Sequence, residues 1–348
     1  MITGATGFVG GALAQALLAD GDTVVAATRG SDTAADLQAM GARVRPASLA
    51  DPNELARVAD GCELIYHCVG VERQAITQSA LPWLHVAAIE NVLSAAAHAG
   101  VRRVVLLSCG DVTLSRKDRI NWREQQPLAA PPYDAWCRTK LMGEEVALHR
   151  SSSAGVEVAA IRPGWLWGAG DRTQLPALCR EACAGGIRLF GSGDNLFSSA
   201  HVDNVVHALR LAANAADAPG GAFHVTDGEY QTSSEFFGAL AAALGTRARR
   251  GWFPLSYIRA HVRAVLGSEP PWPADVLRRA RGSLLDCQRA ITDLGYTPKI
   301  SVQQGMAELA TWVTQQGGVG VLARTPPRAA DPRLAEEFEA VAANAQEA

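Results

Sequence analysis

The chain has 348 residues, of which 48% are hydrophobic, and a formal net charge of −3 at pH 7. This length and apolar content can bury a large core, as one sizeable domain or as one domain with a smaller partner. Basic residues are dispersed, so no nucleic-acid partner is expected, and no uncharged run reaches the ~18 residues that span a bilayer. No signal-peptide pattern is present, so a cytoplasmic protein is expected.

Seven cysteines are spread along the chain without a C-x-x-C pair. Cys179 and Cys183 are one helical turn apart, but no histidine lies near them in sequence. This spacing argues against a disulfide framework, and no metal site is predicted.

The first element along the chain is a glycine-rich loop, residues 3–10 (TGATGFVG), which runs into a helical stretch at 11–18. Gly4 allows a tight strand-to-helix turn, Gly7 lets the backbone approach a pyrophosphate, and Gly10 lets the helix pack on the sheet. A diphosphate would then meet the free N–H groups at the start of the helix. The loop therefore predicts dinucleotide binding by Gly4, Thr6, Gly7, Phe8, Val9 and Gly10.

The strand before this loop is short in the sequence. A buried strand of about five residues is usual at this place, and only Met1 and Ile2 precede the loop. Either this strand is a stub or the start of the protein lies upstream.

Strand and helix signals alternate through the first half of the chain. The predicted strands cover 23–27, 42–46, 63–69, 103–108 and 156–163, and the predicted helices cover 52–58, 84–99 and 133–149. Alternation of this kind predicts an α/β fold with a doubly wound, parallel Rossmann-type sheet of about six strands.

The pattern changes beyond Trp167. A glycine-rich loop at 191–195 breaks the alternation, and a helix begins at Val202. We expect a dinucleotide-binding domain over 1–170, joined by a strand and a helix around 200–225, and a smaller substrate-binding region over 171–315. Residues 316–348 lack a core pattern and are expected to form a mobile tail, with one surface helix after Pro332.

Four segments together carry a resemblance to a known family. They are the glycine loop, the stretch 161–171 (IRPGWLWGAGD), the motif 201–204 (HVDN) and the stretch 294–298 (LGYTP). In this order, over about residues 1–315, the chain resembles the extended short-chain dehydrogenase/reductase family. It is most similar to the NAD-dependent epimerase/dehydratase and 3β-hydroxysteroid dehydrogenase-like branch, which implies the Rossmann fold and is less specific for the reaction.

The resemblance implies a catalytic Ser or Thr, a Tyr, and a Lys four residues after the Tyr. Lys140 matches, but Trp136 stands four residues earlier. One helical turn places both side chains on one face, yet an indole has no usable acid/base pKa. Cys109 aligns with the catalytic serine, with Ser108 one position before it.

Tyr133 follows two prolines, much as the family's tyrosine does. Seven residues before Lys140 it would project from the same helix face, about 10 Å away along the axis, unless the helix starts later. Tyr133 therefore acts as the acid or is an ordinary capping or packing residue, and Trp136 is expected to line the substrate pocket.

The resemblance also implies further cofactor contacts. Thr28 and Arg29 after the second strand offer no carboxylate for a ribose, so NADP is favoured over NAD, although Arg29 could be a surface charge. Ser48 replaces the family's adenine-contacting aspartate. The remaining predicted contacts are Leu49, Cys68, Val69 and Gly70 by backbone, Lys140 on the ribose, Pro163 and Gly164.

Aromatic residues in the second region favour a bulky apolar substrate over a nucleotide sugar, whose phosphates need several basic partners. They are Trp165, Trp167, Phe190, Phe197, Trp252, Phe253 and Tyr257. The alternative is that these side chains form core. The stretch 252–266 is amphipathic and would be a substrate lid, a membrane-surface contact or a packed helix.

The sequence thus predicts an NAD(P)H-dependent oxidoreductase acting on the carbonyl or hydroxyl of a steroid-, isoprenoid- or polyketide-like small molecule. Tyr133, Cys109 through water, or the substrate itself would supply the proton. The alternative is a non-redox isomerase or cyclase, or a catalytically impaired NAD(P)-binding regulatory protein. A homodimer through helices 84–99 and 133–149 is expected.

Overall fold

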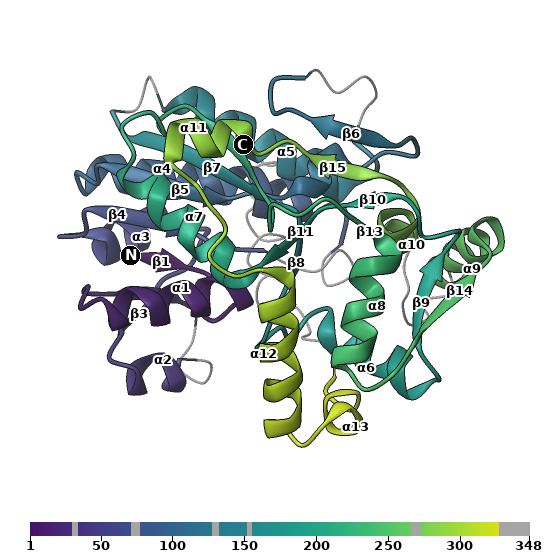
Figure 1. The fold of residues 1–348 in the computed structure, drawn as a ribbon. Helices are drawn as coiled ribbons and strands as arrows, with labels where there is room; N and C mark the ends of the chain where they lie inside the picture. The colour runs from purple at the N-terminus through teal and green to yellow at the C-terminus, as the bar shows by residue number, and fades with distance from the viewer. Residues whose placement is uncertain (30–33, 71–76, 127–131, 152–154, 266–272, 327–348) are drawn as a thin grey trace.

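The computed structural model describes residues 1–29, 34–70, 77–126, 132–151, 155–265 and 273–326, with the side chains of 263–265 excepted (Figure 1). Within these ranges the chain builds a large parallel sheet and a second region of short strands and helices.

The large sheet has seven strands in the order β12-β7-β5-β4-β1-β2-β3. Every neighbouring pair in it is parallel. The strands are β1 (Ile2–Thr3), β2 (Val25–Thr28), β3 (Arg43–Pro46), β4 (Leu64–His67), β5 (Arg103–Leu107), β7 (Glu157–Pro163) and β12 (Ala222–Val225). The order of the strands reverses between β1 and β4, which is where ligands bind in open α/β sheets.

Helices cover both faces of this sheet, as the continuous burial of strands such as β2, β5 and β7 requires. On β5, Val104 and Leu106 face one apolar core with α3 (Pro52–Ala59), α4 (Ala88–His98) and α5 (Ala135–Arg150). Val105 and Leu107 face the other core with α1 (Phe8–Ala19), α2 (Ala35–Ala39), α7 (Val202–Asn214) and α11 (Gln288–Leu294). The predicted doubly wound Rossmann-type fold is confirmed.

The predicted elements of the first half are confirmed, and their bounds shift by one or a few residues. Helix 11–18 begins earlier, at Phe8, because the glycine loop leads directly into α1. Helix 84–99 is split into a π-helical turn, Trp83–Ala87, followed by α4. Helix 133–149 begins two residues later than predicted, at Ala135.

The second region contains three smaller sheets. Their strand orders are β13-β10-β15-β6, β11-β8 and β14-β9. The strands are β6 (Arg119–Trp122), β8 (Trp165–Trp167), β9 (Ile187–Phe190), β10 (Leu196–Phe197), β11 (Ser199–His201), β13 (Gln231–Thr232), β14 (Ala248–Gly251) and β15 (Ser283–Leu285). The helices are α6 (Leu175–Cys183), α8 (Ser233–Ala243), α9 (Phe253–Val265), α10 (Pro273–Ala280), α12 (Val302–Gln315) and α13 (Val319–Leu322).

Residues 316–326, which were expected to belong to a mobile tail, are packed against the protein instead. Residues Val319 and Leu322 of α13 pack against the apolar core of the second region, and Arg180 of α6 donates hydrogen bonds to the carbonyls of Ala323 and Thr325. The short apolar run of α13 was too brief to give a core signal. The surface helix expected after Pro332 lies outside the described residues.

Four of the aromatic residues expected around the cleft belong to the core instead. Trp167 and Phe190 are each 2% exposed. Trp165 packs edge to face with Phe236, and Phe197 packs against the same ring at a tilt of 35°. Burial of their large apolar area stabilises the core. Trp165 and Phe197 also border the cavity described below.

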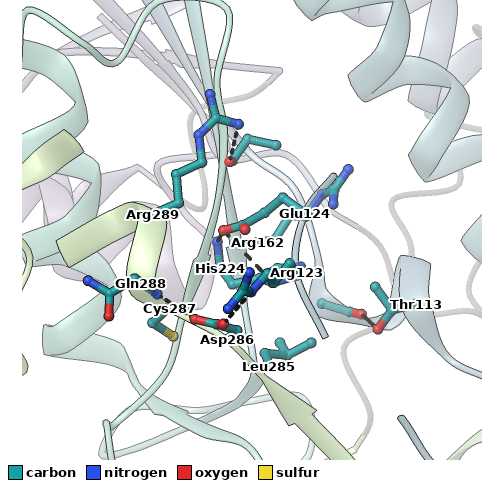
Figure 2. Close-up of polar contacts among 12 residues, drawn as sticks. Thr113, Arg123, Glu124, Arg162, His224, Leu285, Asp286, Cys287, Gln288 and Arg289 are labelled. Atoms are coloured by element: carbon teal, nitrogen blue, oxygen red, sulfur yellow. Dashed lines mark hydrogen bonds and ion pairs between the residues drawn. The ribbon is translucent and has the colours of Figure 1, made fainter. Parts of the chain in front are cut away.

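A buried polar cluster ties the second region to the edge strand β12 (Figure 2). The Glu124 carboxylate accepts the backbone N–H of His224 at 2.6 Å, and Arg289 donates to the carbonyl of Ala222 at 3.3 Å. Arg123 and Asp286 form an ion pair at 2.9 Å between the ends of β6 and β15. These contacts occupy groups on the open edge of the sheet and hold β6 and β15 against it.

Candidate functional site

The glycine loop lies at the carboxyl end of β1, tight against the end of β4. Gly4 has φ +75°, and a Cβ there would meet the carbonyl carbon of Cys68 at 2.8 Å. A Cβ on Gly10 would lie 2.2 Å from the Gly4 oxygen. Both positions therefore require glycine, because a side chain would collide with backbone.

The N-terminus of α1 is open towards this loop. The N-cap is Gly7, which has no side chain to accept a hydrogen bond from the first turn. Phe8 and Thr6 are half-buried and Val9 is buried, so these residues would contact a ligand with backbone N–H groups. A helix start with unfilled donors beside a glycine turn fits a pyrophosphate.

Cys68, Val69 and Gly70 follow β4 and complete the floor of this site. The N–H of Cys68 donates to the carbonyl of Thr3 at 3.0 Å, and burial raises the pKa of the Cys68 thiol to about 12. Cys68 therefore stays a neutral thiol, and its predicted backbone contact with a cofactor stays a prediction.

Lys140 reaches the same place from α5. Its ammonium donates to the carbonyl of Val69 at 3.2 Å and to the carbonyl of Leu107 at 3.4 Å, at the ends of β4 and β5. The side chain is buried, and burial lowers the pKa of Lys140, partly offset by the nearby groups of Cys109, Glu144 and Cys68. A buried cation thus lies beside the switch point of the sheet.

Two contacts fix the position of α5, and with it Lys140. A Cβ on Gly143 would lie 1.7 Å from the carbonyl oxygen of His85, so α5 packs directly on the turn that precedes α4. Glu144 is fully buried and forms a bidentate ion pair with Arg162 of β7. A planar guanidinium on a carboxylate resists rotation of the helix.

Trp136 packs towards the turn before α4. Its ring meets His85 edge-on at 5.4 Å between centroids, while His85 shares a hydrogen bond of 2.8 Å with Thr139. Trp136 is not among the residues that border the cavity described below. The structure therefore gives the indole a packing environment.

Tyr133 lies before α5, because Asp134 is the N-cap and accepts the N–H of Cys137. The projection from a helix face, about 10 Å from Lys140, is therefore wrong. The Tyr133 hydroxyl instead lies 2.8 Å from the hydroxyl of Tyr257 on α9. Burial, then this hydrogen bond, raises the pKa of Tyr133 above its usual range.

Cys109 and Ser108 lie at the end of β5. The Cys109 sulfur accepts the N–H of Asp111 at 3.3 Å, capping a 3₁₀ turn over Gly110–Thr113. Ser108 is buried, its N–H donates to the carbonyl of Ile161, and its hydroxyl has no hydrogen-bond partner among the described residues.

A small cavity opens beside this turn. Its lining includes Gly110, Leu114, Trp165, Phe197, Arg278 and Leu285. Asp111 borders it too, and the Nε of Arg278 lies 3.4 Å from a carboxylate oxygen of Asp111. Sequence reasoning missed this pair, because α10 is far from residue 111 in the chain and no motif links them, and it named Tyr257 only as an aromatic residue of the cleft, without its partner Tyr133.

Pro163 and Gly164 bring the end of β7 close to this cavity. A Cβ on Gly110 would lie 2.6 Å from the Pro163 oxygen, and one on Gly164 would lie 2.6 Å from the Ser198 oxygen. The N–H of Gly164 donates to the carbonyl of Val225. These close approaches join the two regions of the molecule at the cavity.

The predicted adenine-side residues follow β2 and β3. Arg29 comes directly after β2 and is half-buried. The Ser48 hydroxyl accepts the N–H of Ala50 at 3.0 Å, and Asn91 donates to the carbonyl of Leu49 at 2.8 Å. Ser48 and Leu49 therefore stabilise a turn.

Two other features of the described residues were considered. The ligand atoms of His201, Asp203 and Glu308 lie within 4.8 Å of one another. Asp203 and Glu308 are exposed, and Nδ1 of His201 accepts the N–H of Asp203, so we assign no metal to them. No helix in the described ranges has the length and apolar character needed to cross a membrane.

Comparisons with known proteins place this geometry in a family. Residues 1–225 match the NAD dependent epimerase/dehydratase family. The chain is 30% identical over 320 residues to a 4-hydroxy-2-methyl-3-oxo-4-farnesyl-3,4-dihydroquinoline-1-oxide ketoreductase of Stigmatella aurantiaca, covering 88% of this chain and 94% of that protein. It is 26% identical to a 3-beta-hydroxysteroid dehydrogenase of Mycolicibacterium neoaurum, covering 90% and 91%.

A solved structure shows the same fold. The UDP-glucose 4-epimerase of Thermotoga maritima, determined with UDP-glucose, superposes with a TM-score of 0.73 at 19% identity and covers 90% of this chain and 98% of that one.

Proposed function

Because the chain belongs to the NAD-dependent epimerase/dehydratase family, we propose that it is an NAD(P)-dependent oxidoreductase that interconverts a ketone and a hydroxyl on a bulky apolar small molecule. The observation that carries the proposal is the buried Lys140 ammonium, held by the carbonyls that end β4 and β5. A cation in that place, next to an open helix N-terminus, suits a dinucleotide bound across the switch point.

The substrate class is supported by the relatives and by the character of the cavity walls, while the cavity itself is small, about 20 Å³. Leu114, Trp165, Phe197 and Leu285 give the cavity an apolar lining. Arg278 carries the positive charge there and is already paired with Asp111. A nucleotide diphosphate would need several free basic partners. Relatives named for a farnesyl-bearing quinoline oxide and for a steroid favour a steroid-, isoprenoid- or polyketide-like substrate.

The residues at the glycine loop fit a nicotinamide dinucleotide, which supplies or accepts the hydride when bound. Lys140 would hold the ribose, and the N–H groups at the start of α1 would hold the pyrophosphate. We propose NADP over NAD because Arg29 follows β2 where an NAD enzyme has a carboxylate. The variant Arg29→Asp is expected to lower the preference for NADPH over NADH at least about tenfold.

The proton donor is proposed to be Tyr133. Trp136 lacks an acidic proton, and Tyr133 packs against Leu114, which lines the cavity. A phenol with a raised pKa stays protonated at neutral pH, which is the state that can protonate a nascent alkoxide. A hydrogen bond with the Tyr257 hydroxyl orients Tyr133. The Cys109 sulfur lies at the carboxyl end of β5, as does the Leu107 carbonyl that accepts a hydrogen bond from Lys140.

The test measures cofactor binding and turnover separately. Purified protein is titrated with NADPH and NADH, and oxidation of each is then followed with a panel of apolar ketones and enones. We expect binding and turnover of at least one bulky ketone. Tight binding without turnover would favour the impaired regulatory protein, and turnover without net oxidation would favour an isomerase.

Two further proposals concern the assembly and the location of the protein. The homodimer through α4 and α5 stays a prediction for sedimentation velocity. The cytoplasmic location is proposed because NADPH is the reductant we expect, and fractionation of cells would test it.

A further inference from the structure

Helix α9 carries an exposed apolar face that the proposed chemistry does not use. Of the ten exposed large apolar side chains among the described residues, four lie within 252–262. Trp252 is 70% exposed, Ile258 60%, Val262 53% and Leu255 38%. The other six are scattered over the molecule, which is normal for single surface residues.

These four side chains lie on one side of the helix. The N–H of Ser256 donates to the carbonyl of Trp252, so the helical turn includes Trp252. Spacings of three and four residues then align the row on one face. The opposite face holds Phe253, Tyr257 and Ala260 against the protein. The helix is thus apolar on both sides. Packing against the core explains the apolar residues of the inner side only.

The charge along the segment that contains this face has a single sign. The sequence contains no Asp or Glu between Glu235 and Glu269, and it holds Arg247, Arg249, Arg250, Arg259 and Arg263 in that interval. Of these, Arg247, Arg249, Arg250 and Arg259 are described and exposed. The whole chain is net negative, so this segment departs from the average of the molecule.

We propose that the outer face of α9 docks on an anionic lipid bilayer. An amphipathic helix with an interfacial Trp, aliphatic residues and flanking arginines lies in the plane of the headgroups, with its apolar side ~5–10 Å deep. Figure 1 shows α9 at the rim of the molecule beside α10 and β14, where a flat surface can reach it. A second copy of the chain fits less well, since arginines of two identical faces would repel.

The same helix touches the candidate site from its inner side. Tyr257 is hydrogen-bonded to Tyr133, and Phe253 and Tyr257 pack with Leu114 and Trp136. Docking would therefore place a bilayer one helix away from the reacting group. An apolar substrate would then enter the site from the bilayer. This step rests on the proposed function, whereas the docking itself does not.

The test is flotation of the full chain with vesicles in a density gradient. We expect the protein to float with vesicles rich in phosphatidylglycerol at ~0.1 M salt, and at least about tenfold less with pure phosphatidylcholine or at ~1 M salt, where the Debye length falls to ~3 Å. Arg250→Gln and Arg259→Gln are expected to weaken vesicle binding by about fivefold each.

The apolar row is tested by the double variant Ile258→Ser and Val262→Ser, which should lower vesicle binding at least about tenfold. The matched control is Ile291→Ser with Val321→Ser, two similarly exposed residues on α11 and α13, and it should float like the unchanged protein. Turnover of a water-soluble ketone should be the same in all these variants, so loss of flotation cannot be confused with failure of the chemistry.

The proposal is overturned if the protein floats with neither kind of vesicle, or if the α9 and control variants lose flotation equally. It is also overturned if the unchanged protein forms a dimer that the Ile258→Ser, Val262→Ser variant dissolves while no vesicle is bound. Capture of a protein partner that needs α9, without vesicle binding, would give the surface to that partner instead.

Discussion

The hydroxyl of Tyr133 lies 2.8 Å from the hydroxyl of Tyr257, so a residue just before α5 is joined to a helix of the second region. The two phenols are 124 positions apart in the chain. If Tyr133 is the acid, Tyr133→Phe should lower kcat by about a hundredfold or more while the affinity for NADPH stays the same. Stopped-flow single turnover would separate the two quantities.

Tyr257→Phe should have a smaller effect on kcat, because it leaves the Tyr133 hydroxyl in place and removes only the partner that orients it. Tyr230→Phe is the control, since that side chain is 78% exposed and should change nothing. Full-rate turnover by Tyr133→Phe would exclude the phenol as the acid and would leave Cys109 through water or the substrate itself.

Lys140→Met should weaken NADPH binding by about 10- to 100-fold, the usual loss for hydrogen bonds made by a charged group. Met has a similar length and removes a buried charge, so the free energy of unfolding should stay the same or rise. Titration by cofactor fluorescence and thermal unfolding measure the two effects. Lys117→Met, at an exposed position, is the control, and equal losses in both variants would contradict the role of Lys140.

Gly10→Ala should destabilise the protein by about 1–3 kcal/mol and abolish cofactor binding, because its Cβ would lie 2.2 Å from the Gly4 oxygen. Gly238 in α8 is also helical, and nothing lies within 4 Å of a Cβ there. Gly238→Ala should therefore be neutral or stabilise by about 0.5–1 kcal/mol. Chemical unfolding of both variants checks this, and a stable Gly10→Ala that binds NADPH would refute the close-packed loop.

Glu144→Ala should cost about 3–5 kcal/mol, because it leaves the Arg162 guanidinium buried without its carboxylate. The surface pair of Glu90 and Arg150, at 3.2 Å with both side chains at least 40% exposed, is the comparison. Glu90→Ala should cost about 0–1 kcal/mol. Similar costs for the two variants, measured by urea unfolding, would mean that the buried pair does not anchor α5.

Acid should destabilise the protein through two buried histidines. Burial lowers the pKa of His67 and of His224 to about 3, from an ordinary value of 6.5. A depressed folded pKa contributes stability that is present above about pH 6.5 and is lost as the pH falls towards 3, because the unfolded chain takes up the proton first. Each imidazole adds about 1.4 kcal/mol per pH unit to the slope in this window.

Unfolding curves at several pH values measure that slope. His224→Phe should flatten it by about one proton, while His98→Phe, on the exposed end of α4, should leave it unchanged. An equal slope in the His224 variant would show that this ring is already solvated or protonated in the folded state.

The Rossmann half could be predicted because its signals are local. The glycine loop, the short apolar strands and the α3 start at Asp51 and Pro52 are each encoded within a few residues, and the observed bounds of the strands and of α3 differ only at their ends. Lys140 was placed correctly on α5 by one helical turn of spacing, although its cofactor role stays a prediction.

The rest of the site could not be predicted because its neighbours are distant in sequence. Tyr133 was assigned to a helix that begins only at Ala135. The prolines before Tyr133 gave no information about its partner, Tyr257. The Asp111 and Arg278 pair joins segments far apart in the chain. Trp167 and Phe190 were placed around a cleft although they are buried in the core, because sequence distinguishes poorly between an aromatic wall and an aromatic core.

The pairing of β6 with β15 has a consequence for how the protein is made. Arg119 donates its N–H to the carbonyl of Gly282, and β6 runs parallel to a strand that the ribosome completes only at Leu285. All seven strands of the large sheet are complete by Val225. During synthesis the strands of the large sheet can therefore pair while β6 still lacks its neighbour, so the cavity beside Gly110 closes only after α10 and β15 have been made.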